Sequence, residues 1–372
     1  MNFMTRRKFT KMAMASGLIG LGSTTANAAT IPKLNLDEPI EDLKRRILFK
    51  VITLQAVHGV PGLSLTLLRE GTPVWSEAYG VKDLEARSKM DVDTVFETSA
   101  LTKPIHAYAA LALWNEGRLD LDRKFGLYLS EEFQKNIPES YLDFTARMVL
   151  CHRTGLPNMH PGPDRPLPAF TPGESFLYSG IGYTILQEVM TEITGKQIDE
   201  LCNEYVLHPL GMDHSSLVWI DEFDDTLATA YGIKLKLGLK RKLTKPMGRS
   251  SLVCSPSDFA KFVSHTLQCA KTPPDEKNKA IYDLMLTPVS DVQKGVKWGM
   301  GWGLQECGGE TSFWHWGNNE NKYHSLAIGY PKHGLGIVLM ANSGNGLRLC
   351  RELVPEIIGG CHPIFDYKMV VP

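Results

Sequence analysis

Short runs of apolar, β-branched and aromatic residues, typical of β-strands, lie near both ends of the chain. In the first region, GLSLTLLRE and PVWSEAYG are joined at residues 70–72, which predicts a hairpin. In the second region, SFWHWG, YHSLAIGY and LGIVLMA predict three further strands, with a turn at residues 331–334 between the last two. Because these runs follow one another closely, we expect antiparallel pairing.

Between the two regions, apolar residues recur at helical spacing. Residues 105–117 (IHAYAALALWNEG) are apolar on nearly every side, which predicts a buried helix that ends at its glycine. Residues 183–195 (YTILQEVMTEITG) have one apolar face and a terminal glycine, which predicts a second helix. Residues 348–358 predict a third helix, which Pro355 is expected to kink or end. Residues 156–173, rich in proline and glycine, predict an exposed loop.

These elements together predict a mixed α+β fold. We expect an antiparallel sheet built from N- and C-terminal strands and flanked by helices, with an inserted, mostly helical subdomain. The sheet part is expected within residues 45–99 and 290–372 and the helical part within about 100–289, so that residues 29–372 form a single domain. A chain of 372 residues is long enough for such a domain.

Composition narrows the possible partners. The chain is 43% hydrophobic and 22% charged, as in ordinary globular proteins, and its net charge of −1 indicates neither a nucleic acid nor an anionic membrane as partner. Its seven cysteines form no C-x-x-C pair, so we expect no metal, no cofactor and no dense disulfide framework, with most cysteines buried as small apolar residues. A small molecule or peptide is the expected substrate, and the oligomeric state stays open.

Residues 1–28 have the features of an export signal. They contain Arg6-Arg7, a short apolar stretch and the cleavage pattern Ala26-Asn27-Ala28. Residues 5–9 (TRRKF) resemble a twin-arginine signal, with an ordinary secretory signal as the alternative. The apolar stretch is too short to span a bilayer, so no stable membrane insertion is expected. The mature chain is therefore expected to begin near residue 29 and to work in the periplasm or outside the cell.

Candidate chemistry gathers in FETSALTKP, residues 96–104. Pro104 lacks an N–H and is tolerated only in the first turn of a helix, so the buried helix is expected to begin between residues 100 and 103. Free backbone N–H groups and the positive end of the helix dipole favour a developing oxyanion at such a place. Lys103 lies one turn from position 100 and close to Ser99. Helical spacing alone does not decide which of residues 99 and 100 has its side chain beside the Lys103 amine.

Several segments in sequence order resemble the serine beta-lactamase and penicillin-binding-protein superfamily, in particular its class C-like, esterase and D-peptidase branch. They run from GVPGLSLTLLREGTPVWSEAYGVKDLE through DTVFETSALTKP, LCHRTGLP and YSGIGYTILQEVMTEITG to LHPLGMDHSS, WGMGWGL and WHWGNN, and span nearly all of the mature chain. The resemblance implies a beta-lactamase/transpeptidase-like fold. It also implies acyl-transfer hydrolysis of a beta-lactam, D-peptide or ester through a serine acyl-enzyme.

The first family motif, S-x-x-K, is incomplete. Its lysine matches Lys103, so that its serine should be residue 100, which is Ala100, while Ser99 falls one place early. The chain is then a serine-to-alanine active-site variant, a natural member without the nucleophile, or a protein in which Ser99 takes over after a local shift. Ser99 is otherwise expected to cap the helix.

The second motif is Tyr178-Ser179-Gly180, similar to the family's Y-x-N or Y-S-G element. The resemblance implies that Tyr178 is a general base. We expect the Lys103 ammonium to lower the tyrosine pKa, so that a tyrosinate takes the serine proton. Gly180 stands on the substrate side, where many relatives have asparagine. His152, in LCHRTGLP, matches a structural turn of the family.

The third motif is His315-Trp316-Gly317, similar to the family's K-T-G or H-x-G strand. The resemblance implies that His315 orients or polarises the site and that the N–H of Asn318 joins that of the nucleophile in an oxyanion hole. Gly317 would permit a close backbone approach.

Two functions follow from these residues. The first is an exported serine hydrolase that Ala100 leaves inactive or impaired, and the second is a non-catalytic periplasmic binding protein for peptidoglycan-like or peptide ligands. The basic stretch KLKLGLKRKLTK, residues 234–245, is expected to form a solvated hairpin, or to steer an acidic substrate.

Overall fold

The computed structural model describes residues 32–160, 162, 165–238, 242–272 and 275–371. The export signal expected at residues 1–28 lies outside these described residues.

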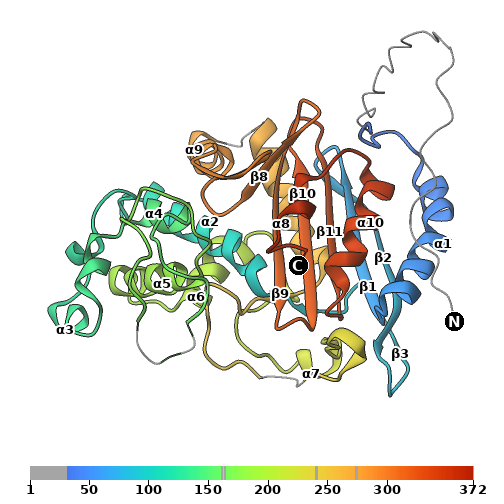
Figure 1. Ribbon diagram of the computed structural model, residues 1–372, viewed down its shortest axis with the longest axis horizontal. Coiled ribbons are helices and arrows are strands. Elements are labelled where there is room, and N and C mark those ends of the chain that lie inside the picture. The colour runs from blue at the N-terminus through green and yellow to red at the C-terminus, as the bar shows by residue number, and fades with distance from the viewer. Residues whose placement is uncertain (1–31, 161, 163–164, 239–241, 273–274, 372) are drawn as a thin grey trace, which may run out of the picture. The chain divides into compact units, whose positions relative to one another are not determined.

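The described residues contain a nine-stranded antiparallel sheet that joins both ends of the chain (Figure 1). The strand order is β3-β2-β1-β11-β10-β9-β8-β7-β6, so the N-terminal hairpin pairs directly with the last strand of the chain. The bounds are β1 Gly62–Arg69, β2 Thr72–Asp83, β3 Ser88–Lys89, β6 Ser290–Gln293, β7 Val296–Trp298, β8 Gly303–Cys307, β9 Glu310–Asn319, β10 Tyr323–Tyr330 and β11 Leu335–Ala341. A separate pair, β4 Phe96–Glu97 and β5 Val253–Cys254, lies beside the first motif. The expected mixed fold with an antiparallel sheet is confirmed.

Helices cover both faces of the sheet and form a separate group at one side of it (Figure 1). Their bounds are α1 Ile40–His58, α2 Thr102–Asn115, α3 Glu131–Gln134, α4 Ala146–Leu150, α5 Gly180–Thr194, α6 Ile198–Cys202, α7 Phe223–Thr226, α8 Pro256–Lys271, α9 Glu276–Leu286 and α10 Gly346–Ile358. Short helical turns lie at Ser99–Leu101, Phe125–Leu127, Glu139–Asp143, Asn203–Leu207, Ile233–Leu235 and Pro363–Asp366.

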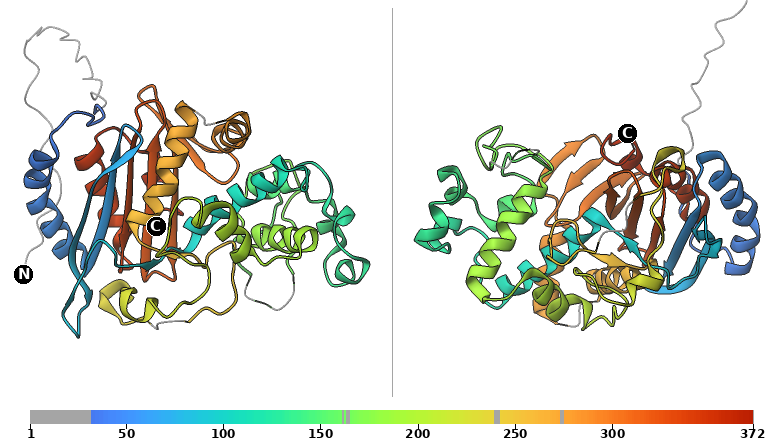
Figure 2. Two further views of the ribbon diagram at one scale, coloured as in Figure 1. Left: turned by 180° about the vertical axis from the view of Figure 1, so that it is seen from behind. Right: turned by 90° about the horizontal axis from the view of Figure 1, so that it is seen from below.

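The strands bury both faces because alternate side chains point to opposite sides of the sheet. On β11, Ile337 and Leu339 join the core beneath α1 and α10, whereas Val338 and Met340 join the core beneath α8. Figure 2 shows α8 across the second face in its left view. The sheet is therefore the middle of three layers, which holds its strands in place next to the helical group.

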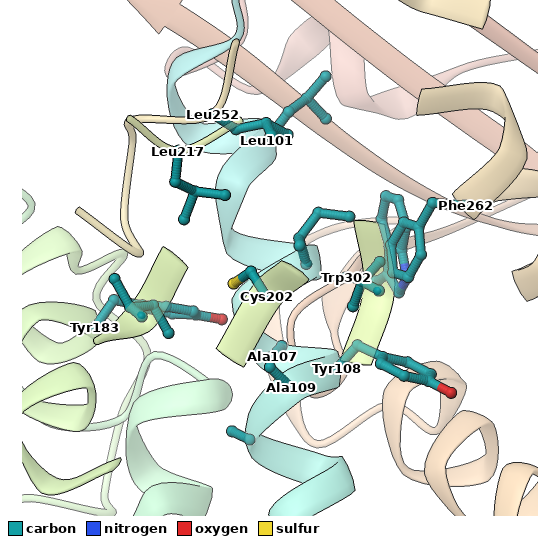
Figure 3. Close-up of a cluster of buried hydrophobic side chains, with 14 of the residues drawn as sticks. Leu101, Ala107, Tyr108, Ala109, Tyr183, Cys202, Leu217, Leu252, Phe262 and Trp302 are labelled. Carbon is teal, nitrogen blue, oxygen red and sulfur yellow. The ribbon is translucent and has the colours of Figure 1, made fainter. Parts of the chain in front are cut away.

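Helix α2 is the centre of the helical group, which explains why it is apolar on all sides. From Thr102 to Leu113 every residue is buried, and α2 packs against α5, α6, α8, α9 and the segment that holds Trp302 just before β8 (Figure 3). Burial of large apolar side chains contributes about 1.5–3 kcal/mol each. The helix ends at Asn115, and Gly117 adopts a left-handed conformation just after it, as expected.

Helix α10 does not end at Pro355 but continues to Ile358, because a proline in the last turn removes only one backbone hydrogen bond of the helix. Five of the seven cysteines are buried and free, as expected for most of them, while Cys307 and Cys361 form a disulfide whose pairing the sequence did not indicate.

The described part of the basic stretch is a narrow loop, closed by a bridge between Tyr231 and Leu237, with Leu235 and Leu237 exposed. Residues 239–241 of this stretch lie outside the described residues. In the part of the chain that the structure covers, none of the helices has the length and apolar character needed to cross a membrane.

Candidate active site

The turn that leads into α2 has an unusual backbone. Ser99 has a φ of 51°, a left-handed conformation that is uncommon for residues other than glycine and that clusters at functional sites. The turn is closed by hydrogen bonds from the N–H of Leu101 to Thr98 and from that of Thr102 to Ser99. The N–H of Ala100 precedes both bonds, so the turn itself leaves this donor available for an oxyanion.

Ser99 does not cap the helix, which corrects the expectation from sequence. Its hydroxyl donates to the backbone carbonyl of Asn318 at 3.0 Å, so it faces strand β9. The hydroxyl of Thr102 instead donates to the carbonyl of Ser99 at 2.7 Å.

Lys103 is buried beside the tyrosine of the second motif. Its side chain is 2% exposed, and Nζ lies 4.9 Å from the ring centre of Tyr178 and 3.0 Å from the carbonyl oxygen of Arg249, to which it donates. Burial, with the charge of Arg249 as a second cause, lowers the pKa of Lys103 to about 7. At physiological pH, Lys103 is therefore a neutral amine in a large fraction of the protein molecules, and a neutral amine can act as a base.

Tyr178 lies at the centre of the aromatic groups that surround the site. Its ring centre is 4.3 Å from that of His152, 4.8 Å from Trp316, 5.5 Å from Trp298 and 6.2 Å from His315. Its buried hydroxyl has no hydrogen-bond partner among the described residues. A buried hydroxyl without a partner costs about 1–3 kcal/mol, and this one lies on a ring that packs against the rings of His152 and His315, whose Nε2 atoms are also unpartnered.

The expected direction of the tyrosine pKa is wrong. Complete burial raises the pKa of Tyr178 well above its ordinary value, with smaller contributions from Tyr183 and Tyr367. Removal of water disfavours the phenolate more than a nearby amine of pKa about 7 favours it. The group whose pKa has moved to neutrality is Lys103.

His315 lies on β9 with its ring fully buried. Burial, with Lys103 as a second cause, lowers the pKa of His315 to about 3, so the ring is neutral. Its Nδ1–H donates to the carbonyl of Trp316 at 2.8 Å, which leaves Nε2 as a hydrogen-bond acceptor. Nε2 is buried and lacks a donor among the described residues.

Gly317 lets β9 approach the turn that holds position 100. A Cβ atom at Gly317 would overlap the carbonyl oxygen of Thr98 and the hydroxyl of Ser325. Ser325 donates to this carbonyl at 2.9 Å and helps to hold the two segments together. Asn318, the next residue, is thereby brought against Ser99, beside Ala100.

The structure adds His152 to the site, although the sequence suggested only a structural turn. Its Nδ1 accepts the N–H of Ser179 at 3.0 Å, so the ring proton is on Nε2. This N–H donor is buried, lies in the ring that packs on Tyr178, and has no acceptor among the described residues. No local sequence signal marks it, because residues 152 and 178 meet only through folding.

Gly180 has no room for the asparagine of many relatives. A Cβ atom there would lie 2.6 Å from the carbonyl oxygen of Asn158 and 2.9 Å from its Oδ1. Asn158 thus brings an amide to this place from the loop that precedes the motif, and Arg249 also lies close by. Ser179 caps α5 by accepting the N–H of Gly182 at 2.9 Å, so its hydroxyl is structural.

The structure therefore brings together position 100, Lys103, Tyr178, His315 and the backbone of Asn318. Trp298 packs against both Tyr178 and His315 and forms part of the floor. Within the described residues, no group of three or more histidine, cysteine, aspartate or glutamate side chains is placed to hold a metal ion.

Comparisons with known proteins show the family and the fold of this chain. The beta-lactamase family model matches residues 50–352. The chain is 24% identical over 328 residues to Protein flp of Staphylococcus aureus (strain MW2), a match that covers 82% of the chain and 63% of flp, so the chain spans less than two thirds of that relative.

Two solved structures share the fold. A class C beta-lactamase has a TM-score of 0.75 at 17% identity, with 87% of this chain and 98% of that one covered. The octameric penicillin-binding protein homologue from Pyrococcus abyssi has a TM-score of 0.69 at 22% identity, with 85% of this chain and 77% of that one covered. At these identities the likeness shows the fold.

Proposed function

Because the chain belongs to the beta-lactamase family, which has a serine-hydrolase fold, we propose that its site is built for acyl-transfer hydrolysis of an amide or ester. Because Ala100 occupies the position of the nucleophile, a protein with this sequence is inactive or impaired. The observation that carries the proposal is the buried Lys103 amine, with a pKa lowered to about 7, one helical turn from position 100 and 4.9 Å from the Tyr178 ring.

With serine at position 100, Lys103 is the base and Tyr178 remains a phenol. The amine takes the serine proton as the serine oxygen bonds to the substrate carbonyl carbon. The carbonyl oxygen becomes an oxyanion held by the backbone N–H groups of residues 100 and 318. The proton then passes to the leaving nitrogen or oxygen as its bond to carbon breaks. Water repeats the sequence on the acyl-enzyme and releases the acid.

The test is to restore the nucleophile. The variant Ala100→Ser is expected to release a stoichiometric burst of p-nitrophenol from p-nitrophenyl acetate, followed by steady turnover. Loss of a nucleophile from such a set costs on the order of 10⁶ in turnover. In the original background, Ser99→Ala tests the remaining alternative, because weak activity that survives this change does not come from Ser99.

A non-catalytic binding protein is the second candidate, and the replacement at Ala100 within an otherwise complete site favours it. In that case the Ala100→Ser variant does not hydrolyse esters, D-peptides or beta-lactams, while the original protein binds one of them.

We also propose export to the periplasm or the exterior, on the twin-arginine-like pair Arg6-Arg7 and the cleavage pattern that ends at Ala28. Fractionation of cells that express the full chain tests this proposal. Replacement of both arginines by lysine should retain the protein in the cytoplasm, and an unchanged distribution would contradict twin-arginine export.

A further inference from the structure

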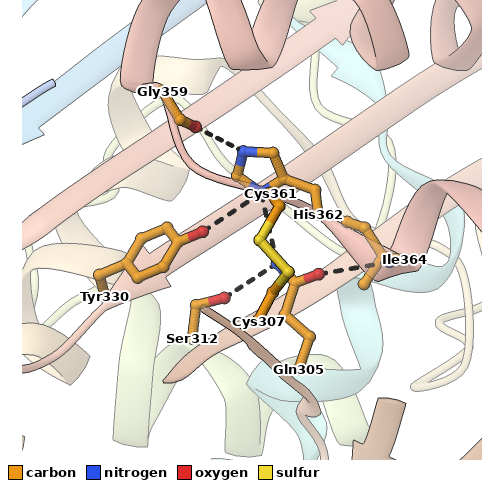
Figure 4. Close-up of a disulfide and its surroundings, with 8 residues drawn as sticks. All are labelled: Gln305, Cys307, Ser312, Tyr330, Gly359, Cys361, His362 and Ile364. Atoms are coloured by element: carbon orange, nitrogen blue, oxygen red, sulfur yellow. Dashed lines mark hydrogen bonds between the residues drawn. A yellow bond between two sulfur atoms is a disulfide. The ribbon is translucent and has the colours of Figure 1, made fainter. Parts of the chain in front are cut away.

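The chain continues past α10 and returns to the sheet beside the candidate site. Cys361 is bonded to Cys307 at the end of β8, and the chain then forms the turn Pro363–Asp366 (Figure 4). Within this C-terminal segment, residues 359–371, Ile364, Phe365 and Val370 are buried in the core beneath α1 and α10.

Polar contacts fix the beginning of the C-terminal segment. The Nε2–H of His362 donates to the carbonyl of Gly359 at 2.8 Å, and the N–H of Ile364 donates to Oε1 of Gln305 at 3.3 Å. With the disulfide and the buried apolar side chains, these contacts leave the backbone near residue 367 little freedom. Its position against the sheet is therefore a built feature of the fold.

Tyr367 connects this segment with the site through a series of ring contacts. Its ring centre lies 6.0 Å from that of Trp316, nearly perpendicular to it, and 6.3 Å from that of Trp314. Trp316 in turn packs at 4.8 Å on Tyr178. The phenol of Tyr367 is also among the groups that raise the Tyr178 pKa, after burial and Tyr183, which agrees with this short separation.

Burial divides these groups into a floor and a rim. Tyr178, Trp298 and Trp316 are at most 3% exposed. Phe176 and Tyr367 are only half-buried, as is Ala100 itself, although all three pack on the same cluster. Phe176 packs on Trp298 and Tyr367 packs on Trp316, and both tryptophans pack on Tyr178. The open surfaces of Phe176 and Tyr367 therefore flank the floor of the site.

The chemistry of this rim favours an uncharged group. A carboxylate pressed against aromatic rings loses its hydration without gaining a donor, whereas apolar surface gains about 25 cal/mol for each Å² that leaves water. We propose that Phe176 and Tyr367, which pack on Trp298 and Trp316, form an aromatic wall that selects substrates with an uncharged apolar group next to the scissile bond, and that Tyr367 is the specificity-determining residue. This inference rests on the proposed function of the same site.

Equilibrium binding to the chain as it exists is the first test, because Ala100 prevents turnover of the ligand. Two probes, N-phenylbutanamide and the carboxylate benzylpenicillin, are titrated while tryptophan fluorescence is followed. The neutral amide is expected to bind about tenfold more tightly or better, a difference of about 1.4 kcal/mol. Tyr367→Ala should weaken its binding about tenfold and Tyr367→Phe less than about twofold, because the ring makes the wall.

Tyr128→Ala is the matched control, since Tyr128 is a half-buried tyrosine in the helical part, outside the wall. It should leave both dissociation constants unchanged. The proposal is overturned when Tyr367→Ala and Tyr128→Ala behave alike, or when benzylpenicillin binds as tightly as the neutral amide.

Kinetics in the Ala100→Ser background separate this proposal from the proposed function. The ratio of kcat/KM for p-nitrophenyl butyrate to that for the monoanionic p-nitrophenyl succinate should fall about tenfold in Tyr367→Ala. If Ala100→Ser turns over both esters but Tyr367→Ala leaves the ratio unchanged, the aromatic wall is overturned and the hydrolase function is retained. If Ala100→Ser shows no turnover but the binding constants change as expected, the hydrolase function is overturned and the aromatic wall is retained.

Discussion

Two buried polar clusters in this protein use the same residue types and satisfy them differently. Beside the disulfide, Nδ1 of His362 accepts from Gln305 at 3.4 Å and Tyr330 at 3.3 Å, while its Nε2–H reaches a carbonyl (Figure 4). In the candidate site, the Tyr178 hydroxyl and Nε2 of His315 have no partner among the described residues.

Burial alone does not distinguish the two clusters. It lowers the pKa of His362 to about 4 and that of His315 to about 3, so both rings are neutral at physiological pH. The difference is in hydrogen bonding. A buried polar atom without a partner costs free energy, and a protein keeps such an atom where a ligand or a reaction completes it. Single unpartnered atoms occur elsewhere, for example Nε2 of His324, whereas in the candidate site the unpartnered atoms of Tyr178, His152 and His315 lie on rings that pack against one another.

The largest expected effect comes from removal of the amine. In the Ala100→Ser background, Lys103→Met should lower kcat/KM for p-nitrophenyl acetate by about 10²–10⁴-fold, the usual contribution of a general base. Lys261→Met, which alters a lysine on α8 paired with Asp258, is the control. Activity that survives Lys103→Met would show that the tyrosine acts without the lysine.

The pH profile should show which group is the base. Lys103 must be neutral to take a proton, and its pKa is lowered to about 7. The kcat/KM of Ala100→Ser should therefore fall about tenfold for each pH unit below 7 and level off above it. A rise that begins only near pH 10 would assign the base to a group with an ordinary lysine or tyrosine pKa.

The disulfide cluster should govern stability rather than chemistry. The double variant Cys307→Ser, Cys361→Ser should lower the free energy of unfolding by about 2–4 kcal/mol, because it frees a loop with a sequence separation of 54 residues. Chemical denaturation with and without reductant measures this loss. Equal stability of the double variant and the original protein would show that the core contacts of the C-terminal segment suffice.

The smallest expected change in stability tests most directly the contrast between the disulfide cluster and the candidate site. Tyr330→Phe deprives His362 of a donor and should destabilise the fold by about 1 kcal/mol, whereas Tyr178→Phe removes an unpartnered hydroxyl and should be neutral or stabilising. Both changes delete one oxygen from a buried tyrosine. Urea denaturation compares them, and an equal loss would show that the Tyr178 hydroxyl is satisfied in the free protein.

Much of the fold follows from local pattern. The hairpin turn at residues 70–72, the three C-terminal strands and the buried helix before Gly117 were predicted because side-chain periodicity depends on neighbours in the chain. Of the two outcomes expected at Pro355, a kink or an end, the end does not occur, because packing of the preceding turns outweighs one lost hydrogen bond near the end of a helix.

Three candidate side chains, Lys103, Tyr178 and His315, came from motifs in the sequence, and the structure places them around one site. Asn158 and Tyr367 were not predicted. Each lies far along the chain from the residues it meets, and no spacing rule connects residue 367 with residue 178. The Cys307–Cys361 pairing could not be predicted from the sequence for the same reason.

By itself, the amino-acid sequence determined five of the strands (β1, β2, β9, β10 and β11), three of the helices (α2, α5 and α10), the family resemblance and the alanine at position 100. Tertiary structure alone decided the protonation of the site, because the pKa of Lys103 and that of Tyr178 depend on how much water the surrounding chain excludes. It also decided that the C-terminal segment lies beside Trp316, since packing across distant segments is set by the whole core.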